Sequence, residues 1–204
     1  MVQTLSRGEQ RSGDSRLAPL NAPLFSGLLD GLEEEHRYVV LDLGPALRET
    51  IGIFSGHRCR LDIVDLADDL GRLNGLSEDE ERLALAESLV RPDSGQRADL
   101  VLCWDLLNYL DRPALRTLMA CVARRAHHGA RVHALMSYAA PDMPALPNHY
   151  LPTEDNHLHV VPMTDDRRDS PRYTLEDLST CMPAYRMERA MLLRNGMQEY
   201  LFRL

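Results

Sequence analysis

The most constraining feature of this chain is a buried strand that runs directly into a glycine and then a helix. The stretch YVVLDL (38–43) is apolar apart from its acid, and Gly44 precedes a helical pattern from Pro45 to about Ser55. A strand this apolar is typical of the centre of a parallel sheet. In open α/β sheets, ligands bind at the carboxyl ends of such strands, often against the first amides of the next helix. The sequence therefore predicts an α/β domain with a ligand site near Gly44.

The remainder of the chain repeats this alternation. Strand-length apolar segments follow at four places: 59–66, 98–104, 130–138 and 157–163. Helical patterns occupy four further segments, which begin at Pro23, at 76, at Pro113 and at Thr174. Near the C-terminus two strands flank Asn195-Gly196, a strong hairpin signal because both central positions of a type I′ turn need positive φ. The order predicts a Rossmann-like three-layer αβα fold, with a mostly parallel sheet and a C-terminal antiparallel β-hairpin.

Several helix ends carry residues typical of caps. They are Asn21 before the first helix, the capping box of Ser77 with Glu80, Thr174 with Asp177 as the cap of a later helix, and Gly129 as a C-cap after His127-His128. Each of these assigns a boundary that a structure can check.

Two segments interrupt the alternation. Residues 1–20 are rich in Ser, Gly, Gln and Arg without periodicity, which predicts a flexible N-terminal arm before one domain at 21–204. Residues 139–156 contain four prolines and predict a long loop. Because this loop leaves the carboxyl end of strand 130–138, we expect it to be a lid over the substrate.

The composition argues against several classes of function. Net charge is −8 and the charges are interspersed, so no nucleic-acid partner is expected. The chain has no lysine, which excludes Schiff-base chemistry and a P-loop. No apolar run approaches the ~20 residues that span a bilayer, and the N-terminus lacks the apolar core of a secretory signal. With four scattered cysteines and no CxxC pair, we expect a soluble, bacterial-type cytoplasmic protein with reduced thiols and no membrane association.

The order of motifs resembles that of the class I S-adenosylmethionine-dependent methyltransferases. The resemblance covers residues 38–204 and rests on "LDLG", a second strand ending in an acid, "ADLVLCWDLLNYLDRPALRTLM", "HHGARVHAL" and the terminal hairpin. It implies S-adenosylmethionine as cofactor, with Asp42 and Gly44 near its methionine end and Asp65 on its ribose hydroxyls. It also implies that Asp105 lies at the cofactor edge of the sheet, with Asn108 and Tyr109 following.

The chain departs from the family pattern in three places, one of which is the lack of an NPPY-type motif after the strand at 98–104. Where the family has three glycines at alternate positions, this chain has Gly44, Ala46 and Arg48. The 31 residues 67–97 show no third strand, where the family usually carries an acid against the adenine; Asp69 and Asp93 are the substitutes present.

Histidines and a tyrosine offer candidates for chemistry. His149 and Tyr138 are the weak catalytic candidates, as a proton acceptor near the cofactor edge. His157 and His159 alternate on one strand with His149 nearby, a pattern that can hold zinc, but no acidic partner accompanies them and no metal is expected.

Two functions remain open on the sequence. The first is a divergent S-adenosylmethionine-dependent methyltransferase acting on an unidentified small molecule, since methyl transfer needs mainly in-line positioning of the reactants. The second is a catalytically inactive methyltransferase-like module, a pseudoenzyme that binds a protein partner. A nicotinamide-dependent oxidoreductase ranks third, because G-x-G-x-x-G is missing. Substrate and oligomeric state stay open.

Overall fold

A computed structural model describes residues 18–91, 95–153, 155 and 157–204. Its main sheet has six strands in the order β10-β11-β5-β4-β2-β3. They are β2 (Tyr38–Asp42), β3 (Cys59–Ile63), β4 (Ala98–Leu102), β5 (Ala126–Ser137), β10 (Arg186–Leu192) and β11 (Met197–Arg203). Strands β3, β2, β4 and β5 are parallel, whereas β11 is antiparallel to both β5 and β10. The predicted mostly parallel sheet and its terminal antiparallel hairpin are confirmed.

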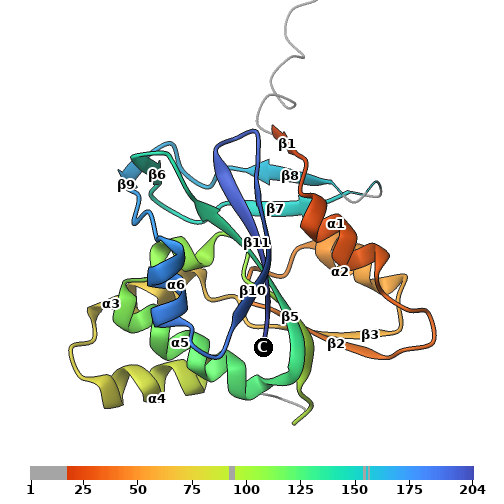
Figure 1. Cartoon of the computed structure of the whole chain (residues 1–204), viewed down its shortest axis with the longest axis horizontal. Coiled ribbons are helices and arrows are strands. Elements are labelled where there is room, and N and C mark those ends of the chain that lie inside the picture. Colours follow the sequence, from red (N-terminus) through yellow and green to blue (C-terminus); the bar gives the residue numbers. More distant parts are fainter. Residues whose placement is uncertain (1–17, 92–94, 154, 156) are drawn as a thin grey trace, which may run out of the picture.

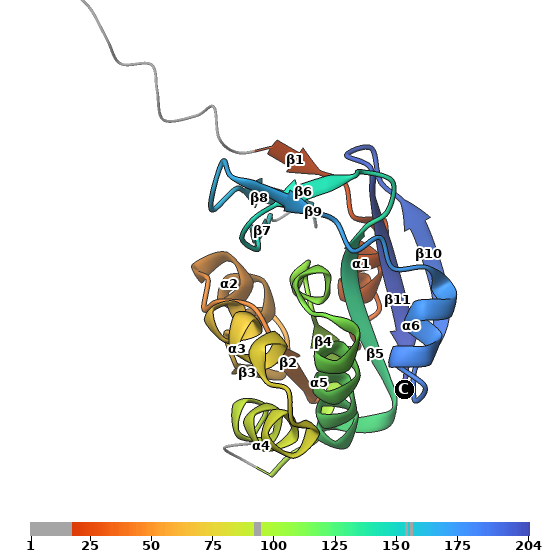
Figure 2. The same cartoon turned by 90° about the vertical axis from the view of Figure 1, so that its left-hand side faces the viewer.

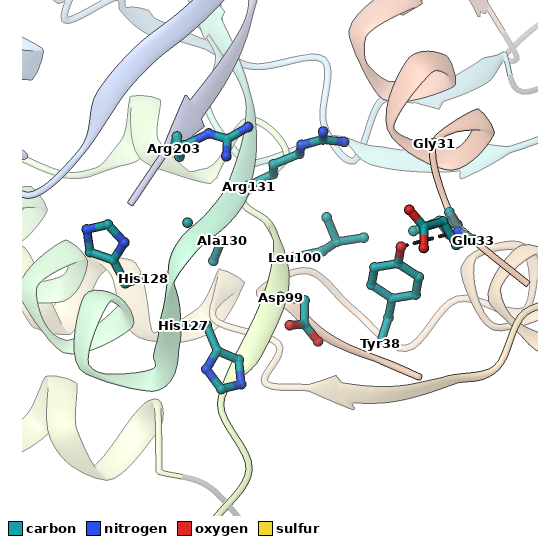
Figure 3. Close-up of a pocket in the computed structure, with 12 residues that line it drawn as sticks. Gly31, Glu33, Tyr38, Asp99, Leu100, His127, His128, Ala130, Arg131 and Arg203 are labelled. Carbon is teal, nitrogen blue, oxygen red and sulfur yellow. Dashed lines mark hydrogen bonds between the residues drawn. The ribbon is translucent and has the colours of Figure 1, made fainter. Parts of the chain in front are cut away.

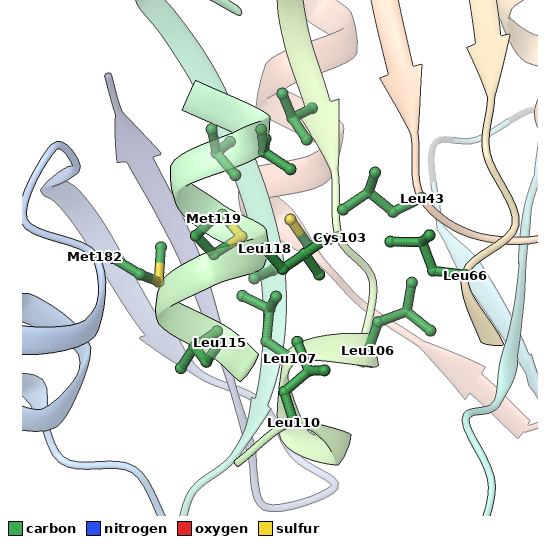
Figure 4. Close-up of a cluster of buried hydrophobic side chains, with 14 of the residues drawn as sticks. Leu43, Leu66, Cys103, Leu106, Leu107, Leu110, Leu115, Leu118, Met119 and Met182 are labelled. Carbon is green, nitrogen blue, oxygen red and sulfur yellow. The ribbon is translucent and has the colours of Figure 1, made fainter. Parts of the chain in front are cut away.

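Helices cover both faces of this sheet, which confirms the three layers (Figure 1). Helices α1 (Pro23–Asp30) and α2 (Arg48–Ser55) pack on one face. The other face carries α3 (Leu70–Gly75), α4 (Asp79–Leu89), α5 (Arg112–Arg125) and α6 (Leu175–Cys181). Two separate apolar clusters fill the spaces between the layers. In the larger cluster, shown in Figure 4, Leu115 and Leu118 of α5 face Leu43 and Cys103, which follow strands of the sheet.

A second, smaller layer of strands lies across one end of the main sheet (Figure 2). It consists of β1 (Ala18–Leu20), β8 (Leu158–Val161) and β7 (His149–Pro152), together with the pair β6 (Asp142–Pro144) and β9 (Arg167–Asp169). The expectation of a loop at 139–156 is therefore wrong for β6 and β7. The last three residues of the expected arm form β1, which pairs with β8, while 1–17 lie outside the described residues.

The first helix is not capped by Asn21. Its N-cap is Ala22, which makes no side-chain cap hydrogen bond. The free N–H groups of Leu24 and Phe25 instead donate to the buried carboxylate of Glu199 on β11, at 2.9 and 2.8 Å. Glu199 therefore accepts the hydrogen bonds that a local cap residue would accept. It lies 175 positions from Leu24 in the sequence, so no local pattern predicts this cap.

Other predicted helix starts and ends also move. Helix α2 begins at Arg48 and not at Pro45. The Ser77 capping box does not form, because α4 begins at Asp79 behind Glu78, which makes no side-chain cap bond. The Thr174 cap with Asp177, in contrast, is confirmed, and both hydrogen bonds of a capping box are present at the start of α6.

Two glycines adopt the left-handed backbone for reasons that differ from those predicted. Gly129, at φ 91°, is not a C-cap: helix α5 runs directly into β5, and Gly129 lies in an irregularity of β5 beside β4. In the hairpin only Gly196 has positive φ, at 81°. Its N–H donates to Leu193 O, so the connection is a turn followed by one left-handed residue, and the type I′ expectation for Asn195 is wrong.

The stretch 67–97 adds no strand in its described part, 67–91 and 95–97. It forms the short 3₁₀ segment η1 (Ala67–Asp69), α3 and α4, and the main sheet ends at β3. The described part of this stretch therefore answers a question that the sequence leaves open, whether a third strand exists between 67 and 97.

Candidate cofactor and substrate site

Three predicted acids lie at the carboxyl edge of the parallel strands. Asp42 ends β2, Asp65 follows β3 by two residues, and Asp105 follows β4 by three. Because parallel strands end at the same edge, the fold brings these side chains to one side of the sheet. The backbone fixes them there: Val64 N donates to Asp42 O and Leu66 N to Leu43 O, each at 2.9 Å.

Asp42 is fully buried and faces the glycine turn. Its Oδ1 accepts hydrogen bonds from Gly44 N at 2.9 Å and from Trp104 Nε1 at 2.6 Å. Its Oδ2 is buried and has no partner among the described residues. Burial raises the pKa of Asp42 to about 6, against the lowering by those two hydrogen bonds, and the nearby Asp65 charge raises it further. The Oδ2 atom of Asp42 therefore lacks a hydrogen-bond donor in the described chain.

Asp65 is the exposed member of the group. Its backbone has a φ of 50°, which is uncommon for a residue other than glycine. The side chain is free to accept hydrogen bonds from a ligand, and its charge reaches Asp42.

Trp104 occupies the space beside Gly44. It is only 4% exposed, and its backbone also has a positive φ of 49°. A Cβ placed on Gly44 would lie 2.6 Å from Trp104 Cδ1 and 2.8 Å from Trp104 Nε1, so the indole is in contact with the turn. The glycine is needed here for the tryptophan. In this conformation the indole lies against the turn to which the resemblance assigns the methionine end of S-adenosylmethionine.

A second aromatic side chain holds Trp104 from outside. The ring of Tyr150, on β7, stacks on the indole with centroids 5.7 Å apart and planes 4° apart. The Tyr150 hydroxyl donates to Asp105 Oδ2 at 3.1 Å. Through this pair, the strand layer above the sheet is joined to the glycine turn.

Asp105 does not face the glycine turn but anchors the strand layer. Besides Tyr150, its Oδ2 accepts from the backbone N and side-chain Nδ2 of Asn148, at 3.1 and 2.9 Å. Its Oδ1 is buried and lacks a partner in the described chain. Burial raises the pKa of Asp105 to about 6, although the bonds from Asn148 and Tyr150 lower it. Burial thus makes the charged form of Asp105 less favourable than that of an exposed aspartate.

Asp105 also lines a pocket of about 230 Å³ at this edge. Asn108 and Tyr109, which follow Asp105 on the 3₁₀ segment η2 (Leu106–Tyr109), line it too. The remaining lining includes apolar side chains from β6 and β11: Met143, Pro144 and Met197. Asn108 is fully used by the protein, since its amide bonds Asp105 O and Leu135 O and its oxygen accepts from Ser137 N.

The other predicted residues do not join this site. Tyr138 is 53% exposed and lines a different hollow with Tyr173 and Tyr200, and His149 is not among the residues around the Asp105 pocket. In the part of the chain that the structure describes, no group of three or more His, Cys, Asp or Glu side chains could hold a metal ion. Asp69 pairs with Arg72, and Asp93 lies outside the described residues.

A further hollow, of about 280 Å³, lies at the amino ends of the strands (Figure 3). Tyr38, Asp99 and His127 line it, each at or near the start of its strand. Figure 3 shows the Tyr38 hydroxyl bonded to the backbone of Glu33, at 3.2 Å. Because ligands of open α/β sheets bind at the carboxyl ends, this hollow is at the wrong edge for the cofactor.

Sequence reasoning missed the two aromatic residues that shape the site. Trp104 is the only tryptophan of the chain and directly follows a buried strand at the carboxyl edge, so a signal was present. Tyr150 was assigned to a loop, and nothing local places it against Trp104.

No family model matches the sequence, and no curated protein sequence matches it significantly. Solved structures do match. An S-adenosylmethionine-dependent methyltransferase from Clostridium acetobutylicum superposes with a TM-score of 0.51 at 13% identity, over 90% of this chain and 92% of that one. A putative O-methyltransferase from Nostoc punctiforme superposes with a TM-score of 0.50 at 14% identity, over 90% of this chain and 56% of the other.

Within the described residues, no helix has the length and apolar character that crossing a membrane requires.

The two matches each cover 90% of this chain. At this identity they establish the fold. The chain has the class I S-adenosylmethionine-dependent methyltransferase fold.

Proposed function

We propose that this chain binds S-adenosylmethionine and transfers its methyl group to a small molecule. The observation that carries the proposal is Asp65, an exposed carboxylate just beyond β3 on a sheet of methyltransferase topology. Neither of its neighbours at this edge could replace it, since Asp42 and Asp105 are buried and bonded to the protein. Asp65 would accept hydrogen bonds from the two ribose hydroxyls.

The pocket beside Asp105 is the proposed acceptor site. Its volume of about 230 Å³ lies below the ~300–1,000 Å³ typical of sites for drug-sized ligands, so the acceptor is small. The arginine in its lining, Arg167, is paired with Asp142. Apart from Asp105, the remaining lining is apolar or carries neutral amide or hydroxyl groups, such as those of Ser137 and Tyr109, so the pocket favours an acceptor without net charge. Asp105, with a pKa of about 6, could receive the proton that an O–H or N–H acceptor releases.

The test is binding of S-adenosylhomocysteine, measured by calorimetry. Asp65→Ala is expected to weaken binding by ~1–3 kcal/mol, because charge-assisted hydrogen bonds to the ribose are lost. Asp68→Ala is the matched control, since Asp68 is also exposed and lies three residues further along. Equal losses in both variants would mean that Asp65 acts only through its charge, and no loss would contradict its role.

A second function is favoured by one observation, the contact of Trp104 with Gly44. If that contact is permanent, the chain is an inactive methyltransferase-like module that binds a protein partner. Absence of binding by S-adenosylhomocysteine and by adenosine would favour this reading, and a pull-down for partners would follow. A cytoplasmic location suits either function, since all four cysteines are unpaired.

A further inference from the structure

The aromatic pair at the glycine turn has features of a closure that a ligand could displace. Trp104 contacts Gly44, donates to Asp42 at 2.6 Å and stacks on Tyr150. The methionine half of the cofactor carries an ammonium group, which is also a donor. The indole N–H thus supplies to Asp42 the kind of hydrogen bond that the ligand would supply.

The closed arrangement leaves several groups poorly satisfied. Trp104 holds a positive φ, a backbone conformation that strains a bulky residue. Asp42 Oδ2 and Asp105 Oδ1 are buried without a partner in the described chain, on either side of the aromatic pair. Movement of the aromatic pair away from the turn would let water or a ligand donate hydrogen bonds to both oxygens. The free energy gained from these hydrogen bonds would offset part of the free energy lost with the aromatic packing.

The pair also rests on an element that is separate from the main sheet. Tyr150 belongs to β7, which pairs with β8 and β1 in the small sheet above the carboxyl edge. A shift of that layer would unstack Tyr150 without breaking a hydrogen bond of the six-stranded sheet.

From these contacts we infer that Trp104 is a displaceable plug, which occupies the methionine half of the cofactor site and leaves it when S-adenosylmethionine binds. The inference rests on the proposed function and adds to it a control of access. Cofactor affinity is then reduced by the fraction of molecules in which the plug is open. Ligands without a methionine half are not affected.

The chain carries its own probe, because Trp104 is its only tryptophan. S-adenosylhomocysteine is titrated into the wild-type chain while tryptophan emission is recorded, with excitation where adenine does not absorb. We expect a saturable shift of the emission to longer wavelength, since the buried indole moves into water. Adenosine, the matched control ligand, should bind without this shift.

Variants measure the same effect independently. Trp104→Ala should bind S-adenosylhomocysteine about 10-fold or more tightly than wild type, with adenosine affinity unchanged. If that variant does not fold, Tyr150→Leu removes the stacking partner and keeps the probe. It should tighten S-adenosylhomocysteine binding, whereas Tyr150→Phe, which keeps the ring, should do so less.

The outcomes separate this inference from the proposed function. Calorimetric binding of S-adenosylhomocysteine to wild type without an emission shift, and with unchanged affinity in Trp104→Ala, would overturn the plug and leave the function standing. Binding by Trp104→Ala alone would show a plug that does not open, and so overturn its displacement. If folded wild type and Trp104→Ala bind neither ligand, both proposals fail.

Discussion

The buried carboxylate of Glu199 should be one of the largest single contributions to stability in this chain. It is fully buried, and it accepts hydrogen bonds from Leu24 N at 2.9 Å and Phe25 N at 2.8 Å. His133 Nε2, on β5, lies at hydrogen-bond distance from the same carboxyl, 2.8 Å from its Oε1. One side chain of β11 thereby caps α1 and binds β5.

Glu199→Gln keeps the shape and replaces one acceptor oxygen by a donor group. At least one buried N–H then loses its partner, which costs about 1–3 kcal/mol. The negative charge at the start of α1 is also lost, which is worth up to ~2 kcal/mol in a buried setting. We expect the free energy of unfolding to fall by about 2–4 kcal/mol and the melting temperature by roughly 5–15 °C.

The assay is urea and thermal unfolding followed by circular dichroism, with Glu188→Gln as the matched control. Glu188 lies on the adjacent strand β10 and pairs with Arg203, whose side chain is 41% exposed, so its loss should cost no more than about 1 kcal/mol. If Glu199→Gln is no less stable than Glu188→Gln, the capping role assigned to Glu199 is refuted.

Two further predictions concern pH and backbone conformation. In Asp42 and Asp105 the pKa is raised by burial from 3.8 to about 6 in the folded chain, so their contribution to stability is fully present below pH ~4 and is lost as the pH rises through 6. In urea unfolding, the free energy of unfolding of the wild type should therefore fall between pH 4 and pH 8. In Asp105→Asn this fall should be smaller than in the wild type by about 2–3 kcal/mol. A fall of the same size in both proteins would contradict the burial argument. Gly196→Ala should destabilise the chain by about 1 kcal/mol, because φ at Gly196 is 81°. Gly71→Ala, inside α3 and with equal space for a methyl group, should stabilise it by ~0.5–1 kcal/mol. If both substitutions change stability in the same direction, backbone conformation does not determine their effect.

The parts of the fold that the sequence predicts are those with strong local periodicity. The strands at 38–42 and 98–102 are short apolar runs that are buried in the sheet, so their pattern alone identifies them. The Thr174 capping box is likewise a local interaction, complete within four residues. Gly196 shows the limit of this success, since the dipeptide indicates a hairpin but not its turn type.

The parts that escape prediction depend on contacts between distant segments. Glu199 caps a helix from the far end of the chain, which makes the local signal at Asn21 misleading. The segment around β7 is rich in proline and looks like a loop, but pairing with β8 and stacking of Tyr150 on Trp104 order it. The positions of the acids at 42, 65 and 105 can be predicted because the end of a strand is visible in the local sequence. The contact of Trp104 with Gly44 joins two distant segments, so no local pattern predicts it.

The most direct test of the account is a crystal structure of the chain with S-adenosylhomocysteine. We expect the ribose hydroxyls to lie against the Asp65 carboxylate, the amino-acid half beside Gly44 and Asp42, and the Trp104 indole withdrawn from the turn. A nucleoside bound elsewhere, or bound with its ribose away from Asp65, would contradict the assignment of the cofactor site.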